Sequence, residues 1–399
     1  MTRLSARFVL PPLLLVTACG NTAPGVTDDR ATPTHADGQE APLPDGITAE
    51  TITDRLEHPW GIAFLPDGRA LVTERPGRLR VVRPAGDVSE PVGGVPEVFA
   101  ENQGGLLDIA LDPAFAANDR IYLSYARRCP GGGATTAVTR AKLVDKGDGA
   151  SLADAEDILV ADACHPGGRH FAGRMVFDRD GYLYVAVGDR GIGEAADNAA
   201  VQDLRNHIGT VLRLTTDGAP APGNPFADRK DADAAVFTYG HRNIQGMTLH
   251  PDSGAVWTHE HGPRGGDEVN ILVAGTNYGW PEITYGEHYR GGEIGPEAAE
   301  GLAQPQLYWD PSIAPSGMVF VDQDAAIPEW RGDLLVGALA YQLLSRLEWN
   351  RDTGTLVETD RVLVNELGRI RSVTQAPDGA IVILTDAPNG KVVRLVRSG

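Results

Sequence analysis

Two short stretches of the chain concentrate residues that bind anions, carbonyl groups and a divalent cation. Residues 241–246 read His-Arg-Asn-Ile-Gln-Gly, and residues 260–268 read Glu-His-Gly-Pro-Arg-Gly-Gly-Asp-Glu. Arg242 beside the amide of Asn243 suits a polyanionic ligand, because guanidinium and amide N–H groups bind carboxylate oxygens. A glycine-rich loop that ends in two carboxylates offers main-chain and side-chain oxygens to a hard cation such as calcium. Together the stretches predict an anionic cofactor held beside a metal ion.

The elements that must position these groups follow a repeated pattern. An alternating apolar segment leads into a turn that carries Asp-Gly or Pro-Asp, and a second alternating segment follows. Residues 60–73 and 175–185 are the clearest copies, and both predict β-hairpins. Looser copies lie at residues 107–125, 247–257, 318–336 and 373–384. The pattern therefore occurs six times.

Six short-strand units, spaced roughly 40 to 75 residues apart with no long amphipathic helix between them, favour radially arranged blades. We therefore predict an all-β fold, a six-bladed β-propeller over residues 46–399. Stacked β-sandwiches are the alternative, because alternation predicts strands in both folds. Loops from successive propeller blades meet at one mouth of the central channel. Candidate residues precede the repeated strands in four units, so we expect one shared site; they are Gln103, His170, Arg242 and Arg369.

The N-terminal residues are typical of an export leader. Arginines precede an apolar run, residues 8–16, that is too short to span a bilayer. Residues 16–19, Val-Thr-Ala-Cys, resemble a bacterial lipobox, whose cysteine is acylated and becomes the mature N-terminus. We predict a lipoprotein signal peptide over residues 1–18 and a lipid anchor on Cys19, on the outer side of the cell membrane. An ordinary secretory signal, giving a periplasmic or extracellular protein, is the alternative.

Residues 19–45 have a different composition from the rest of the chain. They are rich in Pro, Thr, Ala, Asp and Gly and have almost no bulky apolar side chain. Such a segment cannot bury enough surface to offset the entropy of ordering. We therefore predict a flexible tether between the leader and the propeller.

Cysteine usage agrees with export. Besides Cys19 the chain has Cys129 and Cys164, and a pair in an oxidising compartment more often forms a disulfide than a metal site. Neither cysteine has the C-x-x-C spacing of a zinc site. Two free thiols, or a metal bound by Cys164 with His165 and His170, are the alternatives.

The formal net charge of −19 limits the classes of partner. A nucleic-acid binder needs a basic stripe that displaces counterions from phosphates, so nucleic acid is excluded as a partner. Tight adsorption to anionic lipid is disfavoured as well, which leaves the lipid anchor as the only link to the membrane.

Seven motifs occur in a fixed order along the chain. They are Gln-Gly-Gly-Leu-Leu-Asp (103–108), His-x-x-Gly-Arg (170–174), Gly-Asp-x-Gly (188–191), Gly-His-Arg-Asn-x-Gln-Gly (240–246), Glu-His-Gly-Pro-x-Gly-Gly-Asp-Glu (260–268), Asn-Tyr-Gly-Trp-Pro (277–281) and Gly-Arg-Ile-Arg (368–371). Taken singly, each has an ordinary structural explanation. The ordered set resembles the soluble quinoprotein glucose dehydrogenase family, in particular its aldose sugar dehydrogenase branch, from residue 56 to residue 395.

The resemblance implies an oxidoreductase that uses pyrroloquinoline quinone (PQQ) and Ca²⁺ to oxidise the anomeric carbon of aldose sugars to lactones. It implies that His170 is the catalytic base, that Asp189 orients it and that Arg242 faces the reacting quinone carbonyl. The implied cofactor contacts are Gln103, Arg242, Asn243, Arg369 and Arg371. The implied metal ligands are the main-chain carbonyls of Gly262 and Pro263 for calcium on the cofactor, and Glu268 and Tyr278 for a second calcium.

These residue types suit that chemistry on physical grounds. Loss of a hydride from the anomeric carbon requires the hydroxyl proton to leave as well. A neutral imidazole, whose ordinary pKa is about 6.5, can accept that proton. A carboxylate on the other ring nitrogen, as Asp189 would supply to His170, fixes the tautomer. Arg242 stabilises negative charge on a carbonyl that receives a hydride. The cofactor carries three carboxylates, and Arg369 and Arg371 alternate on one strand face, which places their guanidinium groups together.

The chain departs from the glucose-oxidising members in three respects. Residues 336–342 contain no Lys or Arg where those members have a lysine, so one cofactor carboxylate lacks that partner. Arg169 precedes His170, and its charge would depress the imidazole pKa if the side chains approached. The loops that close over the sugar and build a dimer interface are shorter, so we expect a monomer that accepts a broad range of aldoses.

Two other functions are compatible with a propeller. A calcium-dependent lactonase would activate water on its metal with clustered carboxylates in the channel, where this sequence places arginines and a histidine. A non-enzymatic sugar-binding propeller is the second, because a fold does not fix a function. For the dehydrogenase, a cytochrome and a membrane quinone are equally compatible electron acceptors.

Overall fold

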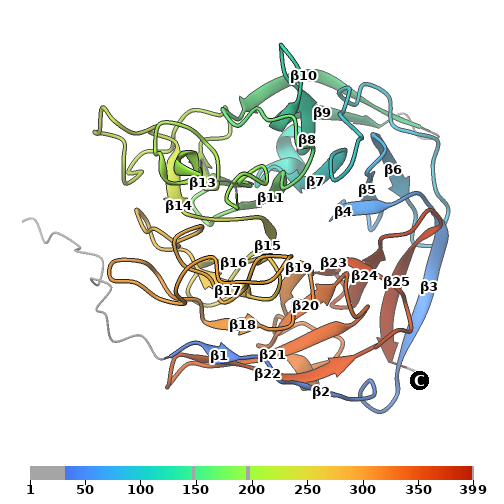
Figure 1. The fold of residues 1–399 in the computed structure, drawn as a ribbon. Helices are drawn as coiled ribbons and strands as arrows, with labels where there is room; N and C mark the ends of the chain where they lie inside the picture. Colours follow the sequence, from blue (N-terminus) through green and yellow to red (C-terminus); the bar gives the residue numbers. More distant parts are fainter. Residues whose placement is uncertain (1–31, 146–148, 195–197, 398–399) are drawn as a thin grey trace, which may run out of the picture. The chain divides into compact units, whose positions relative to one another are not determined.

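The computed structural model describes residues 32–145, 149–194 and 198–397. Six β-sheets follow one another around a common centre and form a six-bladed β-propeller (Figure 1). The predicted fold is confirmed, and each of the six predicted hairpins forms the first two strands of one blade. Within these described ranges, helical structure is limited to α1 (Phe115–Asn118) and two short 3₁₀ turns, η1 (Ala199–Gln202) and η2 (Pro328–Trp330). No described helix has the length and apolar character needed to cross a membrane.

The first three blades are built from consecutive antiparallel strands. Blade 1 consists of β4 (Pro59–Phe64), β5 (Ala70–Glu74) and β6 (Arg78–Val82). Blade 2 consists of β7 (Leu106–Leu111), β8 (Arg120–Arg128), β9 (Ala134–Asp145) and β10 (Ala150–Val160). Blade 3 consists of β11 (Ala172–Phe177), β12 (Leu183–Val187), β13 (Thr210–Leu214) and β14 (Val236–Tyr239).

The last three blades each include a strand from the N-terminal part of the chain. Blade 4 consists of β15 (Ile244–Leu249), β16 (Val256–Glu260), β17 (Asp267–Ile271), β18 (Leu307–Trp309) and β1 (Thr34–His35). Blade 5 consists of β19 (Pro315–Phe320), β20 (Leu334–Ala338), β21 (Leu344–Asn350), β22 (Thr355–Val362) and β2 (Gln39–Glu40). Blade 6 consists of β23 (Ile370–Gln375), β24 (Ile381–Thr385), β25 (Gly390–Arg397) and β3 (Ile47–Leu56).

The ring is closed in two ways. The first strands of neighbouring blades pack on one another in the order β4, β7, β11, β15, β19, β23 and back to β4. Their approach is close, since a Cβ on Gly317 in β19 would lie 2.5 Å from Cα of Ser372 in β23. In blade 6 the N-terminal strand β3 pairs antiparallel with the C-terminal strand β25 (Figure 1, blue beside red). Main-chain hydrogen bonds therefore join the two ends of the propeller.

The hydrophobic core is divided among the blade interfaces. Separate buried clusters lie between consecutive blades all around the ring, for example Leu71 with Leu123 between blades 1 and 2 and Trp257 with Leu334 between blades 4 and 5. A strand sends alternate side chains to opposite sheet faces, so both faces of each blade are apolar. The second strand of five blades is consequently buried at all its residues. In blade 2 the second strand, β8, is buried from Ile121 to Ala126 and more exposed at its ends.

A β-bulge occurs at the start of the first strand in every blade. The pairing register with the second strand shifts there between Pro59 and Ile62, Leu106 and Ile109, Ala172 and Met175, Ile244 and Gly246, Pro315 and Met318, and Ile370 and Ser372. Such bulges redirect side chains and are frequent beside active sites. Four of the predicted site residues lie just before these strand starts, namely Gln103, His170, Arg242 and Arg369.

Residues 32–45 differ from the predicted flexible tether. β1 pairs in parallel with β18 and β2 in parallel with β22, so the segment extends the open edges of blades 4 and 5. Main-chain hydrogen bonds to sheet edges hold it despite its few apolar side chains. Residues 1–31, which contain the predicted leader, Cys19 and the rest of the predicted tether, lie outside the described residues.

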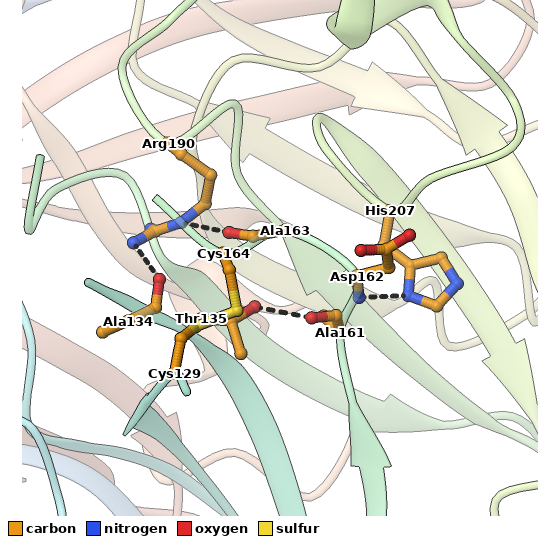
Figure 2. The surroundings of a disulfide bond; sticks show 9 residues. All are labelled: Cys129, Ala134, Thr135, Ala161, Asp162, Ala163, Cys164, Arg190 and His207. Carbon is orange, nitrogen blue, oxygen red and sulfur yellow. Dashed lines mark hydrogen bonds between the residues drawn. A yellow bond between two sulfur atoms is a disulfide. The ribbon is translucent and has the colours of Figure 1, made fainter. Parts of the chain in front are cut away.

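The predicted disulfide is confirmed. Cys129, after β8, is bonded to Cys164, after β10, and 35 residues separate them (Figure 2). The bond ties the end of blade 2 to the segment that leads into blade 3. His165, the histidine of the alternative metal site, is partly exposed and accepts the N–H of Gly167 at Nδ1.

Candidate active site

The predicted base and its predicted orienting carboxylate meet in blade 3. His170 precedes β11 and Asp189 follows β12, and Nδ1 of His170 lies 2.6 Å from Oδ1 of Asp189 in a buried position. From blade 2, Oε1 of Gln103 accepts the main-chain N–H of His170 at 2.8 Å. Gly188 permits this close approach, because a Cβ there would lie 2.1 Å from the carbonyl oxygen of His170. With Nδ1–H directed at the carboxylate, Nε2 of the neutral ring carries the lone pair.

The carboxylate of Asp189 is held by several donors in addition to the imidazole. The N–H groups of Gly191 and Gly193 donate to it at 2.6 and 3.2 Å, and Nε1 of Trp280 donates at 2.8 Å. Burial opposes its ionisation, but the interactions with His170 and the other donors outweigh burial and lower its pKa to about 2. Asp189 is therefore an anion that accepts hydrogen bonds. Trp280 was not among the predicted residues, although it belongs to the Asn-Tyr-Gly-Trp-Pro motif.

Burial lowers the pKa of His170 below its ordinary value. The charges of Arg242 and Arg169 act in the same direction, and Asp189 opposes them. The predicted influence of Arg169 is thus present but smaller than that of burial. The imidazole is neutral at pH 7, which is the protonation state that accepts a proton.

Arg242 lies beside this pair. Its carbonyl oxygen accepts the N–H of Asp189 at 2.8 Å, and its guanidinium donates to the carbonyl of His261 at 3.1 Å and to Oε1 of Glu194 at 3.0 Å. The guanidinium also lies 5.3 Å from the ring centre of Trp280. Burial acts against the charge of Arg242, but Asp189 and Glu194 raise its pKa. No sequence motif singled out Glu194.

A pocket of about 310 Å³ is lined by residues from all six blades, including Phe171 and Ala172, which follow His170. His170 and Arg242 themselves are not among its lining residues. Four of the predicted cofactor contacts line it, namely Gln103, Asn243, Arg369 and Arg371. It is also lined by residues without a predicted role, among them Trp60, Arg75, His261, Leu339 and Asp386. Leu339 belongs to the 336–342 segment without Lys or Arg, so that wall is apolar. Arg75 supplies a third guanidinium group instead.

Asp386 organises the two predicted arginines. Its carboxylate accepts a hydrogen bond from Nη2 of Arg371 at 3.1 Å, lies 3.7 Å from Nε of Arg369 and lies 2.6 Å from Nδ1 of His58. Burial opposes its charge, but Arg371 and His58 outweigh burial and lower the Asp386 pKa to about 2. Burial lowers the Arg371 pKa to about 10. The guanidinium groups of both arginines therefore lie at one carboxylate.

The glycine-rich loop between β16 and β17 differs from the prediction in one respect. Its two terminal carboxylates were expected to offer oxygens to a cation, but the carboxylate of Asp267 is used within the protein. This carboxylate is buried and accepts hydrogen bonds from the N–H of Gly262 at 2.9 Å, the N–H of Ala314 at 3.0 Å and the hydroxyl of Ser312 at 2.6 Å. Burial raises its pKa to about 6. Asp267 therefore shapes the loop from within, because its oxygens are used on the loop's own donors. Pro263 lines a separate hollow of about 830 Å³ on the outer side of the loop.

Gly262, Glu268 and Tyr278, which were predicted to bind calcium, surround one very small cavity of about 10 Å³, together with Arg242 and Glu260. Glu260 and Glu268 are directly paired across β16 and β17. Burial, and repulsion from Glu260, raise the Glu268 pKa to about 8. The Tyr278 hydroxyl donates to the carbonyl of Ile271 at 2.6 Å. Within the described residues, no three His, Cys, Asp or Glu side chains could hold a metal by themselves.

Comparison with known proteins gives a consistent result. A family model for Glucose / Sorbosone dehydrogenase matches residues 56–394. Aldose sugar dehydrogenase YliI of Escherichia coli is 41% identical over 357 residues, which cover 88% of this chain and 93% of that protein. The apo crystal structure of the E. coli soluble aldose sugar dehydrogenase aligns with a TM-score of 0.83 at 39% identity, over 88% of this chain and 99% of that chain. The PQQ-bound aldose sugar dehydrogenase of Streptomyces coelicolor aligns with a TM-score of 0.71 at 28% identity, over 89% and 99%.

Proposed function

The chain belongs to the glucose / sorbosone dehydrogenase family, and we propose that it oxidises aldose sugars at the anomeric carbon to lactones with PQQ and calcium. The observation that carries this proposal is the contact of His170 with Asp189 beside a pocket lined by arginines. A buried, neutral imidazole held by a carboxylate is a competent base. The neighbouring cationic pocket suits a polyanionic redox cofactor.

The pocket residues fit PQQ in size and charge. A volume of about 310 Å³ is at the lower end of the roughly 300 to 1,000 Å³ that small-molecule sites occupy. Three guanidinium groups, from Arg75, Arg369 and Arg371, match a cofactor with three carboxylates, because guanidinium binds carboxylate strongly. The amides of Gln103 and Asn243 supply neutral hydrogen-bonding groups. The third arginine compensates for the lysine that the 336–342 segment lacks.

The catalytic roles follow from the protonation states. Nε2 of His170 accepts the proton of the anomeric hydroxyl while the hydride leaves the anomeric carbon, and the carbon–oxygen double bond of the lactone forms. Asp189 stabilises the imidazolium that results. Arg242 places a buried positive charge where negative charge develops. When bound, PQQ supplies the two-electron acceptor for the hydride, and calcium acts as a Lewis acid on its carbonyl.

Two calcium positions are proposed. The main-chain carbonyls of Gly262 and Pro263 would hold the calcium that contacts the cofactor, on a loop whose shape Asp267 fixes. Glu268 and the carbonyl of Tyr278 would hold the second calcium. The fit of the second position is supported by Glu260 and Glu268, since two carboxylates directly opposite each other on paired strands are stabilised by a cation.

The cellular setting is also a proposal. We propose an exported monomer, tethered through a lipid on Cys19 or released to the periplasm or exterior, which passes electrons to a cytochrome or a quinone. The Cys129–Cys164 disulfide supports export, because such bonds persist in oxidising compartments.

Dye reduction by sugars tests the proposed function. The protein from residue 32 onward is assayed with glucose, galactose and maltose, before and after addition of PQQ with calcium. We expect activity only when both are added, and its loss in His170→Gln. A folded protein that takes up no PQQ, as measured by absorbance, and reduces no dye would refute the proposal. Hydrolysis of lactones with calcium alone would establish the propeller lactonase instead.

A further inference from the structure

Arg190, which follows Asp189, is fully buried although it carries a charge. Its guanidinium donates to three main-chain carbonyls, those of Arg169 at 2.6 Å, Ala163 at 3.2 Å and Ala134 at 3.3 Å. Among the described residues, no carboxylate forms an ion pair with it. Burying a charge in this way is costly unless its hydrogen bonds are made. The carbonyl contacts are therefore what holds the side chain in place.

Two of its contacts are on the residues next to His170. Arg190 bonds the carbonyl of Arg169, which precedes the histidine, and lies 3.7 Å from the ring centre of Phe171, which follows it. The backbone needs this support, because His170 and Ala172 have φ values of 51° and 55°. Residues other than glycine occupy the left-handed region only at an energetic cost, unless their surroundings hold them there.

The remaining contacts connect Arg190 to the disulfide. Ala163 precedes Cys164, and Ala134 forms an isolated antiparallel β-bridge with His165, which follows Cys164. Figure 2 shows the guanidinium of Arg190 directed at both carbonyls beside the bond between the cysteines. Cys129 and Cys164 thus fix the two chain segments whose carbonyls receive the arginine.

We propose that Arg190 is a positioning residue that fixes the main chain on both sides of His170, and that the Cys129–Cys164 disulfide anchors the carbonyls to which it binds. Asp189 orients the imidazole by its side chain, and the adjacent residue fixes the backbone that carries the same imidazole. A lysine cannot replace it fully, because a single ammonium does not span three carbonyls as a planar guanidinium does. The kinetic part of this inference rests on the proposed dehydrogenase activity.

The test compares Arg190→Met with Arg213→Met. Arg213 is the matched control, because it lies in β13 of the same blade and its guanidinium lies 4.1 Å from the Tyr182 ring centre and contacts Asp178. Both partners lie in the turn between β11 and β12, at the opposite end of these strands from His170. The readout that needs neither cofactor nor sugar is the low-field Nδ1 proton signal of His170 in ¹⁵N-histidine-labelled protein. With ten histidines in the chain, the signal is assigned by its loss in His170→Gln.

We expect Arg190→Met to shift or broaden the His170 signal and to lower kcat roughly 10- to 100-fold with KM nearly unchanged, since small misplacements of a catalytic group are costly. Arg190→Lys should recover part of both, and Arg213→Met should change neither. Cys129→Ser with Cys164→Ser, or reduction of the folded wild type, should move the signal in the same direction by a smaller amount. If Arg190→Met does not fold, the His170 signal of the double cysteine variant and of the reduced wild type decides whether the proposal holds.

Other outcomes overturn the inference. If Arg190→Met and Arg213→Met lower the Tm equally and leave the His170 signal and kcat unchanged, Arg190 serves the fold alone. If the arginine variants behave as expected and loss of the disulfide changes nothing, the anchoring role of the disulfide is wrong. A wild type that oxidises no sugar would refute the proposed function, and the NMR signal would still decide the positioning role.

Discussion

Nε1 of Trp280 donates a hydrogen bond to Oδ2 of Asp189 at 2.8 Å, across 91 residues of sequence. The tryptophan comes from the long connection between β17 and β18 in blade 4, whereas Asp189 follows β12 in blade 3. The same indole lies 5.3 Å from the Arg242 guanidinium. The Trp280 side chain therefore holds the carboxylate of Asp189, which is the predicted partner of His170, and it also contacts Arg242.

Replacing Trp280 with Phe should weaken catalysis without dismantling the site. An aromatic ring is kept, although smaller, and one hydrogen bond to a charged acceptor is lost, which costs about 1.5 to 3 kcal/mol, so kcat/KM should fall roughly 10- to 100-fold. The pH profile of kcat/KM provides the measurement. Trp257→Phe, in a blade interface away from the site, is the control and should lower the Tm alone. Equal kinetics in the two variants would remove Trp280 from the mechanism.

Loss of the base or its partner should affect turnover more than cofactor binding. We expect His170→Gln and Asp189→Asn to lower kcat on the order of 10²- to 10⁴-fold, while PQQ titration in the absence of sugar gives nearly the wild-type Kd. His250→Gln serves as a control, because His250 lies at the end of β15 beside Trp257 and Phe320. Retention of more than half the wild-type turnover in His170→Gln would exclude the proposed base, and the same result in Asp189→Asn would exclude the orienting role of Asp189.

The arginines of the pocket should determine PQQ affinity. Arg371→Gln and Arg75→Gln should each weaken PQQ binding roughly 10- to 100-fold, because each removes a charged hydrogen-bond donor to a carboxylate. Binding is measured by absorbance titration in the presence of calcium and without sugar. Arg394→Gln, whose partner Asp378 is on the surface, should bind PQQ like the wild type. An unchanged Kd for Arg75→Gln would mean that nothing replaces the missing lysine.

The pH dependence should reflect the lowered pKa of His170. The neutral ring accepts the proton, so activity should be complete at pH 7 and should fall as the pH drops through a pKa below 6.5. The folded-state pKa lies below the unfolded value, so the unfolded state binds more protons in this range, and His170 should destabilise the fold as the pH falls below about 6.5. The acid limb of kcat/KM and urea unfolding of wild type and His170→Gln check both statements. An acid limb above pH 6.5 would contradict them.

Residues 32–45 should contribute to stability although their composition is that of a tether. A chain that begins at residue 46 loses the added strands of blades 4 and 5, and its Tm should be lower than that of a chain that begins at residue 32. Several hydrogen bonds are lost, each worth about 1 kcal/mol. The free energy of unfolding, measured in urea, should therefore fall by about 2 kcal/mol or more. Both chains retain β3, which controls for closure of blade 6. Identical unfolding curves would show that the segment contributes nothing to the fold.

The sequence alone determined the repeated architecture and predicted most residues of the candidate site. Alternating apolar residues and Asp-Gly turns are local signals, so the paired strands of all six blades could be located from them. His170, Arg242 and Arg369 could be placed at one mouth because each stands at a fixed position before an inner strand. The even pair of cysteines indicated the disulfide for a chemical reason that does not depend on the fold.

Only the tertiary structure decided the partners that come from other blades. Asp386 and Glu194 carry no local signal, and they become site residues because ring closure brings the ends of β24 and β12 to the same mouth. Asp267 and Glu268 are adjacent in sequence, yet one folds inward to shape a loop and the other faces Glu260 across a strand pair. Residues 34–40 are ordered by main-chain bonds to open sheet edges, which composition does not record. A contact between distant segments depends on how the blades close, and no spacing along the chain encodes that closure.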